Sequence, residues 1–282
     1  MIINKEEGII VLILKKCTKS FKKTKALNDF SCEFKHGIYG LLGPNGSGKT
    51  TMMRCICGLL SPEKGSIECD CENIGYLPQQ FGAMKSLTVY ETMRYFATLK
   101  KIPKSNQDNE IRYCIDLVNL SDKIKNKVGS LSGGMVRRLG IAQAIMGNPE
   151  IVLFDEPTAG LDPEERVRFK SLLRKIKNDK TIIISTHIVS DVKSICDEIV
   201  IINEGRNVVQ GTCNDITSIG NEKVFLLDEE YENNLEGNYY VKDRISKDNK
   251  NYIIVLSSNF IEQGVSINAD IEDGYLCALK DI

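Results

Sequence analysis

Hydrophobic positions along most of the chain switch between strand-like and helix-like patterns. Short apolar or alternating runs predict strands at residues 9–14, 26–34, 38–42, 67–76, 151–154, 181–185 and 199–202. Helical periodicity is found at residues 49–60, 88–144, 163–177 and 191–196, with a polar loop expected at 101–109. The runs at 151–154 and 181–185 are apolar almost throughout, which is typical of strands buried on both faces of a parallel sheet. Strands that alternate with helices predict an α/β fold.

The pattern changes after about residue 215. Residues 222–248 are polar and acidic, and strand-like runs follow at 252–256 and 265–269. We therefore predict a domain boundary near residue 216, with a main domain over 1–215 and a small C-terminal domain over 216–282.

The composition is that of a soluble globular protein. The 282 residues include 37 Lys and Arg against 38 Asp and Glu, and 42% are hydrophobic. The balanced charge argues against a nucleic-acid partner, because proteins that bind the phosphate backbone need a surplus of basic residues. The apolar run at 9–14 is too short to cross a membrane, and Glu6 and Glu7 stand where a signal peptide carries positive charge. A cytosolic protein is expected.

Ten cysteines are expected to be reduced thiols. Two Cys-x-Cys pairs raise the alternative of a metal site. Cys55 and Cys57 fall on a predicted helix, where neighbours two positions apart point away from each other. Cys69 and Cys71 can share a strand face, but two thiolates do not complete a tetrahedral zinc site. The sequence therefore disfavours structural zinc.

A glycine-rich turn follows the predicted strand at 38–42. Its residues are Gly43, Pro44, Asn45, Gly46, Ser47, Gly48, Lys49 and Thr50. They fit the phosphate-binding pattern G-x-x-x-x-G-K-[ST] between a strand and a helix. The glycines let backbone N–H groups surround phosphates, while Lys49 places a positive charge on them and the Thr50 hydroxyl reaches Mg²⁺. The turn therefore predicts nucleotide binding.

Two carboxylates end the apolar strand at 151–154. The strand delivers Asp155 beside the nucleotide, where it can hold Mg²⁺ through water. Glu156 can polarise an attacking water as a general base. The alternative is an acidic cluster at a helix start before Pro157, because acids favour that end of a helix.

A second anion site is predicted by Ser132, Gly133 and Gly134, which precede a helical run. A single chain is not expected to use two anion sites for one nucleotide. Two chains that face each other head to tail would use both sites. Each ATP would then lie between the phosphate loop of one subunit and residues 132–134 of the other. The alternative is an ordinary helix start with Ser132 as the N-cap.

These segments, in this order, closely resemble the ATP-binding-cassette (ABC) family over about residues 10–213. The glycine-rich turn resembles Walker A, Gln79 the Q-loop, residues 131–135 the signature, 155–156 Walker B, 159–162 the D-loop and 185–187 the switch histidine segment. The resemblance implies a P-loop NTPase with a RecA-like core, an antiparallel β-subdomain, a helical signature subdomain at about 83–147 and a small α+β C-terminal appendage. Met135 departs from the usual signature Gln, and we expect activity to survive this change.

The resemblance also assigns roles to single residues. Gln79 would join Thr50 and Asp155 around Mg²⁺, and Glu156 would act as the general base. His187 would contact the γ-phosphate, although a structural histidine at a strand end is the alternative. The remaining implied positions are Phe21, stacked on adenine, Thr51, beside the phosphates, and Asp162, at the dimer seam.

Two segments suggest a branch of the family. Residues 74–82 and the passage from Leu131 to Gln143 resemble bacterial ABC-2-type subunits of antibiotic or bacteriocin export. This implies an ATP hydrolase that drives export through separate membrane subunits, paired with a second copy or a relative on the inner face of the cell membrane. The alternatives are a soluble cassette ATPase of translation or DNA maintenance and an import ATPase. No coiled-coil heptads separate Lys49 from Ser132, and there is one cassette, which disfavours the soluble classes.

Overall fold

The computed structural model describes residues 10–282 except 72 and 249. The strands are β1 (Ile10–Phe21), β2 (Thr24–Lys35), β3 (Gly37–Leu42), β4 (Lys64–Cys69), β5 (Ile74–Leu77), β6 (Ile151–Asp155), β7 (Thr181–Thr186), β8 (Glu198–Asn203), β9 (Arg206–Gly211), β10 (Val224–Asp228), β11 (Tyr239–Lys247), β12 (Lys250–Ser257) and β13 (Val265–Ser266). The α-helices are α1 (Lys49–Ile56), α2 (Val89–Leu99), α3 (Lys104–Leu117), α4 (Gly133–Ile145), α5 (Pro163–Ile176), α6 (Val189–Lys193), α7 (Cys213–Ser218) and α8 (Ile271–Lys280). Short 3₁₀ turns span Ser121–Lys123, Val128–Ser130 and Glu229–Asn234.

A largely parallel sheet forms the centre of the molecule. Its strand order is β5-β6-β7-β3-β8-β9, and β9 alone runs antiparallel to its neighbour. Every residue of β6 and β7 is buried, as their apolar sequences predicted. Leu153 packs toward α1 on one face and Phe154 toward α5 on the other, because side chains alternate along a strand. The α/β class is confirmed.

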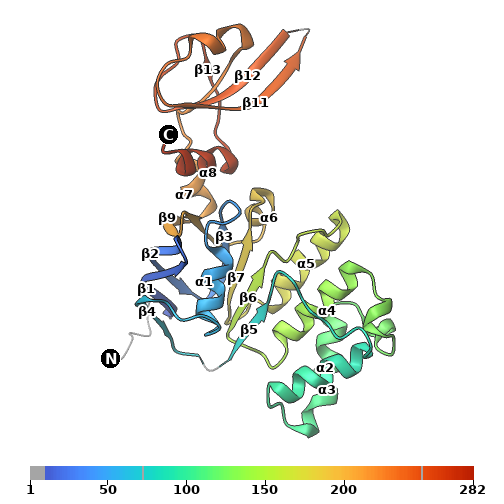
Figure 1. Ribbon diagram of the computed structural model, residues 1–282. Helices are drawn as coiled ribbons and strands as arrows, with labels where there is room; N and C mark the ends of the chain where they lie inside the picture. The colour runs from blue at the N-terminus through green and yellow to red at the C-terminus, as the bar shows by residue number, and fades with distance from the viewer. Residues whose placement is uncertain (1–9, 72, 249) are drawn as a thin grey trace.

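An antiparallel sheet, in the order β2-β1-β4, covers the far side of α1 (Figure 1). Leu12, Leu14 and Phe30 share an apolar cluster with Met52 of the helix, so this sheet and α1 are packed together. The strand predicted at 9–14 begins at Ile10 and continues to Phe21, and residue 9 lies outside the described part of the chain.

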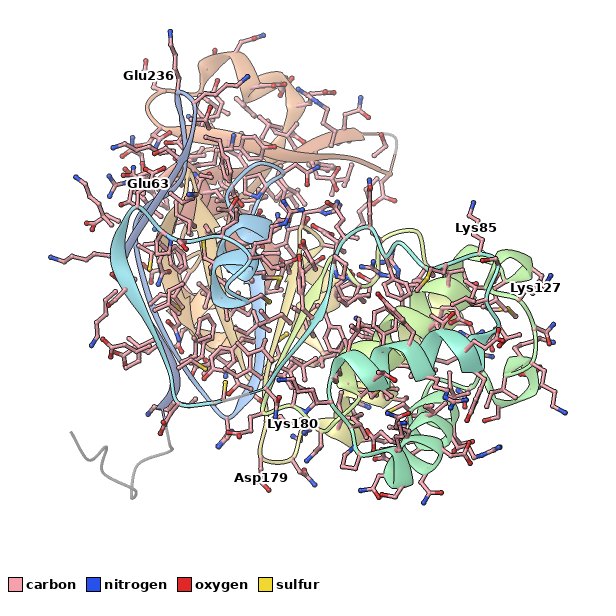
Figure 2. All side chains as sticks on the ribbon, turned by 60° about the horizontal axis from the view of Figure 1, so that its bottom comes forward. Glu63, Lys85, Lys127, Asp179, Lys180 and Glu236 are labelled. Carbon is pink, nitrogen blue, oxygen red and sulfur yellow. The ribbon has the colours of Figure 1, made fainter. Side chains whose placement is uncertain are left out.

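Helices α2, α3 and α4 form a separate lobe beside the central sheet (Figure 1). Lys127 of this lobe and Glu63, which directly precedes β4 of the antiparallel sheet, lie on opposite sides of the molecule (Figure 2). The loop predicted at 101–109 is wrong over most of its length, because α3 begins at Lys104. The sequence there is polar, but Ile111 and Cys114 recur on one face and are fully buried against the lobe's core. A helix with so narrow an apolar face gives a weak periodic signal.

The C-terminal residues form a second antiparallel sheet, β11-β12-β10-β13, joined to the main body through α7 and α8. Strands β10 and β11 lie within the stretch that was described only as polar and acidic, and the strand predicted at 265–269 covers only Val265–Ser266. The boundary predicted near residue 216 falls inside α7. Ile216 of that helix packs with Tyr275 of α8 against Leu42 of the central sheet. The division into 1–215 and 216–282 stays a prediction.

We expect Ile216→Ala to lower the free energy of unfolding by about 2–5 kcal/mol, because it leaves a cavity at a fully buried side chain. Urea-induced unfolding measures the effect. Val167→Ala is the control, because Val167 is exposed on α5, and we expect a change within about 0.5 kcal/mol. Equal values for the two variants would contradict the packing of α7 on the sheet.

Within residues 10–282, less 72 and 249, no helix has both the length and the apolar character needed to cross a membrane.

Candidate active site

The glycine-rich turn between β3 and α1 is shaped by close backbone packing. A Cβ atom at Gly43 would collide with the carbonyl of Ile202, and one at Gly48 would collide with the carbonyl of Ala26. Gly48 also has a φ of +112°, which side chains rarely adopt. The hydroxyl of Ser47 is buried without a hydrogen-bond partner. These features make a cradle of main-chain groups with an unsatisfied polar atom, which fits a phosphate group.

Lys49 is the cation of this turn. Its side chain is only 6% exposed, and its ammonium donates hydrogen bonds to the carbonyls of Gly43 (2.7 Å) and Pro44 (3.0 Å). The Glu156 carboxylate lies 3.9 Å from it. Burial lowers the pKa of Lys49, and the nearby charges of Glu156 and Asp155 oppose that shift. These hydrogen bonds hold the ammonium over the turn. A bound phosphate can replace the two carbonyls as the hydrogen-bond acceptor of Lys49.

A cavity of about 290 Å³ opens beside this turn. Its walls are formed by Ala26, Asn45, Gly46, Gly48, Lys49, Thr50, Thr51, Gln79 and Glu156. The fold thus brings residues of the glycine-rich turn together with Gln79, which follows β5, and Glu156, which follows β6. A single cavity therefore joins three of the predicted segments.

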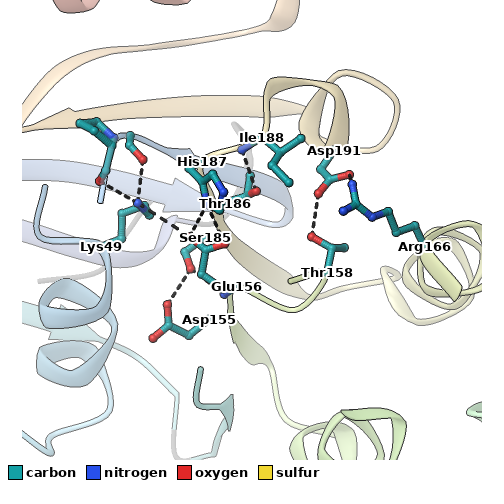
Figure 3. Close-up of polar contacts among 12 residues, drawn as sticks. Lys49, Asp155, Glu156, Thr158, Arg166, Ser185, Thr186, His187, Ile188 and Asp191 are labelled. Atoms are coloured by element: carbon teal, nitrogen blue, oxygen red, sulfur yellow. Dashed lines mark hydrogen bonds and ion pairs between the residues drawn. The ribbon is translucent and has the colours of Figure 1, made fainter. Parts of the chain in front are cut away.

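The end of β6 carries both predicted carboxylates (Figure 3). Asp155 is fully buried and accepts a hydrogen bond from the Ser185 hydroxyl at 2.7 Å. The Tyr76 hydroxyl lies 3.5 Å from its other oxygen, and burial together with the Asp155 charge raises the pKa of Tyr76 to about 12. Glu156 has a φ of +50°, and its N–H donates to the same Ser185 oxygen at 2.9 Å. Ser185 therefore fixes the Asp155 carboxylate and the main chain of Glu156 through one hydroxyl.

His187 follows β7 and meets Glu156. Its Nδ1 atom lies 3.2 Å from both oxygens of the Glu156 carboxylate. The side chain is 46% exposed, so it is not a histidine of the core. Glu156 is placed between His187 on one side and Lys49 on the other, where a general base is expected.

The alternative interpretation of the two carboxylates does not agree with the structure. Residues 157–160 form turns, and the next helix begins only at Pro163. The carboxylate at that helix start is Asp162, which is exposed and accepts a hydrogen bond from the N–H of Glu165 at 2.8 Å. Asp155 and Glu156 are therefore not a helix cap, whereas Asp162 is one.

Residues 132–134 lie outside the cavity, at the start of α4 in the helical lobe (Figure 1). Ser132 is the N-cap of this helix, and its hydroxyl accepts a hydrogen bond from the N–H of Met135. Gly134 lies close to Leu161, so the helix start and the turn at 159–162 are neighbours. Ser132 and Gly133 are exposed and available to another chain.

Phe21 ends β1 and is 47% exposed, with the Lys19 ammonium 5.9 Å from its ring centre. The Lys19 ammonium lies over one face of this half-exposed ring. It does not line the cavity described above.

Sequence reasoning gave no role to several residues around the site. Ser185 orients the Asp155 carboxylate and binds the main chain of Glu156, and Ala26 lines the cavity. Asp191 accepts a hydrogen bond from the Thr158 hydroxyl at 2.6 Å and lies 3.5 Å from Arg166, which ties the turn after Glu156 to the helix after His187. The available signal for these residues was a polar side chain next to an apolar strand. It did not identify their hydrogen-bond partners, which lie far away in the sequence.

The cysteine pairs show no metal centre. Among the residues that the structure describes, no three His, Cys, Asp or Glu side chains are grouped to hold a metal ion. Burial raises the pKa of both Cys57 and Cys71 to about 12, so both are protonated thiols at neutral pH.

Comparison with known proteins gives consistent matches. Residues 27–159 match the protein family described as ABC transporter. The chain is 30% identical over 269 residues to the uncharacterized ABC transporter ATP-binding protein YxlF of Bacillus subtilis (strain 168), covering 92% of this chain and 90% of that protein. It is 32% identical to the Nod factor export ATP-binding protein I of Cupriavidus pinatubonensis, covering 73% and 67% of the two chains. A solved structure, the dimeric post-hydrolysis state of the ATP-binding cassette MJ0796 with ADP and Pi, is similar with a TM-score of 0.65 at 26% identity, covering 71% of this chain and 98% of that one.

Proposed function

The chain belongs to the ABC transporter family, and on that premise we propose that it drives export through separate membrane subunits. It is the ATP-binding, ATP-hydrolysing subunit of an ABC transporter. The observation that carries the residue assignments is the cavity shared by Lys49, Gln79 and Glu156. Export is supported by the Cupriavidus relative, whose name describes Nod factor export.

The proposed mechanism assigns one task to each side chain. Lys49 binds the β- and γ-phosphates, and the N–H groups of the turn hold their oxygens. Glu156 accepts the proton of the attacking water, and His187, 3.2 Å away, holds the carboxylate in place. Oxygen donors from Thr50, Gln79 and Asp155 suit Mg²⁺, which supplies charge neutralisation of the phosphates when it is bound.

We further propose that two chains enclose two ATP molecules. Ser132 and Gly133 are exposed at a helix N-terminus, and residues 132–134 lie outside their own chain's cavity, so they suit the γ-phosphate of ATP bound to a partner. Asp162 would lie at the seam, and the aromatic face of Phe21 would stack on adenine. ATP-driven closure would pull on membrane subunits from the cytoplasmic side of the membrane.

The transporter assignment predicts a membrane partner. We expect the tagged full chain, purified from detergent-solubilised membranes of its own cells, to bring down a polytopic membrane protein in near-equal amount by mass spectrometry. Untagged cells provide the background control. A solute-binding protein among the partners would point to import and contradict export. Ribosomal or DNA-associated partners without a membrane protein would contradict transport itself.

A further inference from the structure

Arg137 is a buried cation of α4 whose hydrogen-bond partners are main-chain carbonyls. The residue as a whole is only 9% exposed. One terminal nitrogen, Nη1, donates to the carbonyls of Pro78 and Gln79, each at 2.9 Å. Arg137 thus holds the segment that carries Gln79 into the cavity.

The rest of the same guanidinium reaches the end of β6. Nη2 of Arg137 donates to the carbonyls of Asp155 and Glu156, each at 2.6 Å, and Nε donates to that of Pro157 at 3.3 Å. These hydrogen bonds stabilise the main chain at the point where Glu156 adopts its left-handed conformation. One side chain therefore joins both segments that line the cavity opposite the glycine-rich turn.

This arrangement is chemically specific to arginine. Burial lowers the pKa of Arg137, but a guanidinium keeps its charge at any ordinary pH. Its planar fork presents five donors, which make five hydrogen bonds to two separate segments, whereas a lysine ammonium has only three donors. All five of its hydrogen bonds go to main-chain carbonyls, and the nearby charges of Asp155 and Glu156 also favour the cation.

The position of Arg137 along α4 supplies the functional link. The helix begins at Gly133 with Ser132 as its cap, so Arg137 lies about one turn from the exposed end. A helix moves as a rigid body over so short a distance, and a shift of residues 132–134 therefore shifts the guanidinium as well. Gln79 and Glu156 would follow, because their carbonyls are bonded to it.

We propose that Arg137 is a positioning residue that transmits the seating of residues 132–134 on the partner's ATP to Glu156 of its own chain. Each site is then set for hydrolysis only when the opposite ATP is in place, which makes hydrolysis cooperative. This inference rests on the proposed two-chain arrangement.

Arg138 offers a matched control on the same helix. Its Nη1 donates to the carbonyls of Val118 (3.0 Å) and Asn119 (2.8 Å), and its Nε pairs with Glu165 at 3.1 Å. It forms no hydrogen bond to residues 78–79 or 155–157 among those described. The same substitution at Arg138 therefore removes a largely buried guanidinium without cutting the proposed link.

The test is the dependence of ATP hydrolysis on ATP concentration in the full chain. We expect the wild type and Arg138→Gln to have Hill coefficients above 1, with 2 as the ceiling for two sites. In Arg137→Gln and Arg137→Lys, the Hill coefficient should fall to about 1. Their kcat should drop about 10-fold or more, while the Kd for ATP changes less than about 2-fold. Circular dichroism checks that each variant is folded.

Distinct results would overturn the inference. If either folded Arg137 variant keeps the wild-type Hill coefficient, or if Arg138→Gln loses cooperativity equally, the link does not run through Arg137. If both Arg137 variants unfold, the residue is structural. A wild-type chain that hydrolyses ATP without an ATP-dependent dimer would overturn the proposed two-chain function, and this inference with it, whereas a cooperative dimer insensitive to Arg137 overturns this inference alone.

Discussion

Lys49→Ala is expected to weaken ATP binding by about 100-fold or more, because charge-assisted hydrogen bonds to phosphate contribute about 3 kcal/mol. The buried ammonium is the cation nearest Glu156 in the cavity, 3.9 Å away. Without it, the triphosphate would face the carboxylates of Glu156 and Asp155 with less positive charge to offset them. Isothermal titration calorimetry with ATP measures the loss.

The matched control for this prediction is Lys64→Ala. Lys64 is an exposed lysine of β4 that does not line the cavity, so its loss should leave affinity unchanged. Undiminished ATP turnover in Lys49→Ala would contradict the assignment of the glycine-rich turn as the phosphate site.

Glu156→Gln is expected to lower kcat about 10²–10⁴-fold, the usual contribution of a general base. Glutamine has the same shape but does not accept the proton of the attacking water. ATP binding should persist, because removal of a negative charge near Lys49 favours the phosphates. The unhydrolysed ATP should hold two chains together, which is measured by light scattering during size-exclusion chromatography with and without ATP.

Glu164→Gln is the control, because Glu164 is exposed on α5, away from the cavity. It should hydrolyse ATP like the wild type and show no lasting dimer. If Glu156→Gln stays monomeric at saturating ATP, the proposed two-chain site is wrong. If it hydrolyses ATP at the wild-type rate, the base is another group.

The sequence predicted most elements of the main domain but fewer beyond residue 215. Strands β6 and β7 were found because burial on both faces demands apolar residues throughout, and this signal is local. Helix α3 was partly taken for a loop, because its few buried positions, such as Ile111, are spread among polar ones. Strand β11 is an edge strand with no fully buried residue, so its pattern carries little hydrophobic alternation.

The sequence by itself determined the phosphate-binding turn and the two carboxylates after β6, because each is a contiguous motif whose chemistry depends on adjacent residues. Only the tertiary structure decided which of these groups meet. The strand order β5-β6-β7-β3 brings Gln79, Glu156 and Lys49 to one cavity, and strand order depends on long-range packing that no short segment encodes. The sequence assigned no role to Arg137, which is one of two adjacent arginines in a predicted helix. Its burial against two distant turns exists only once the helical lobe is docked, since carbonyl partners carry no signature in the sequence.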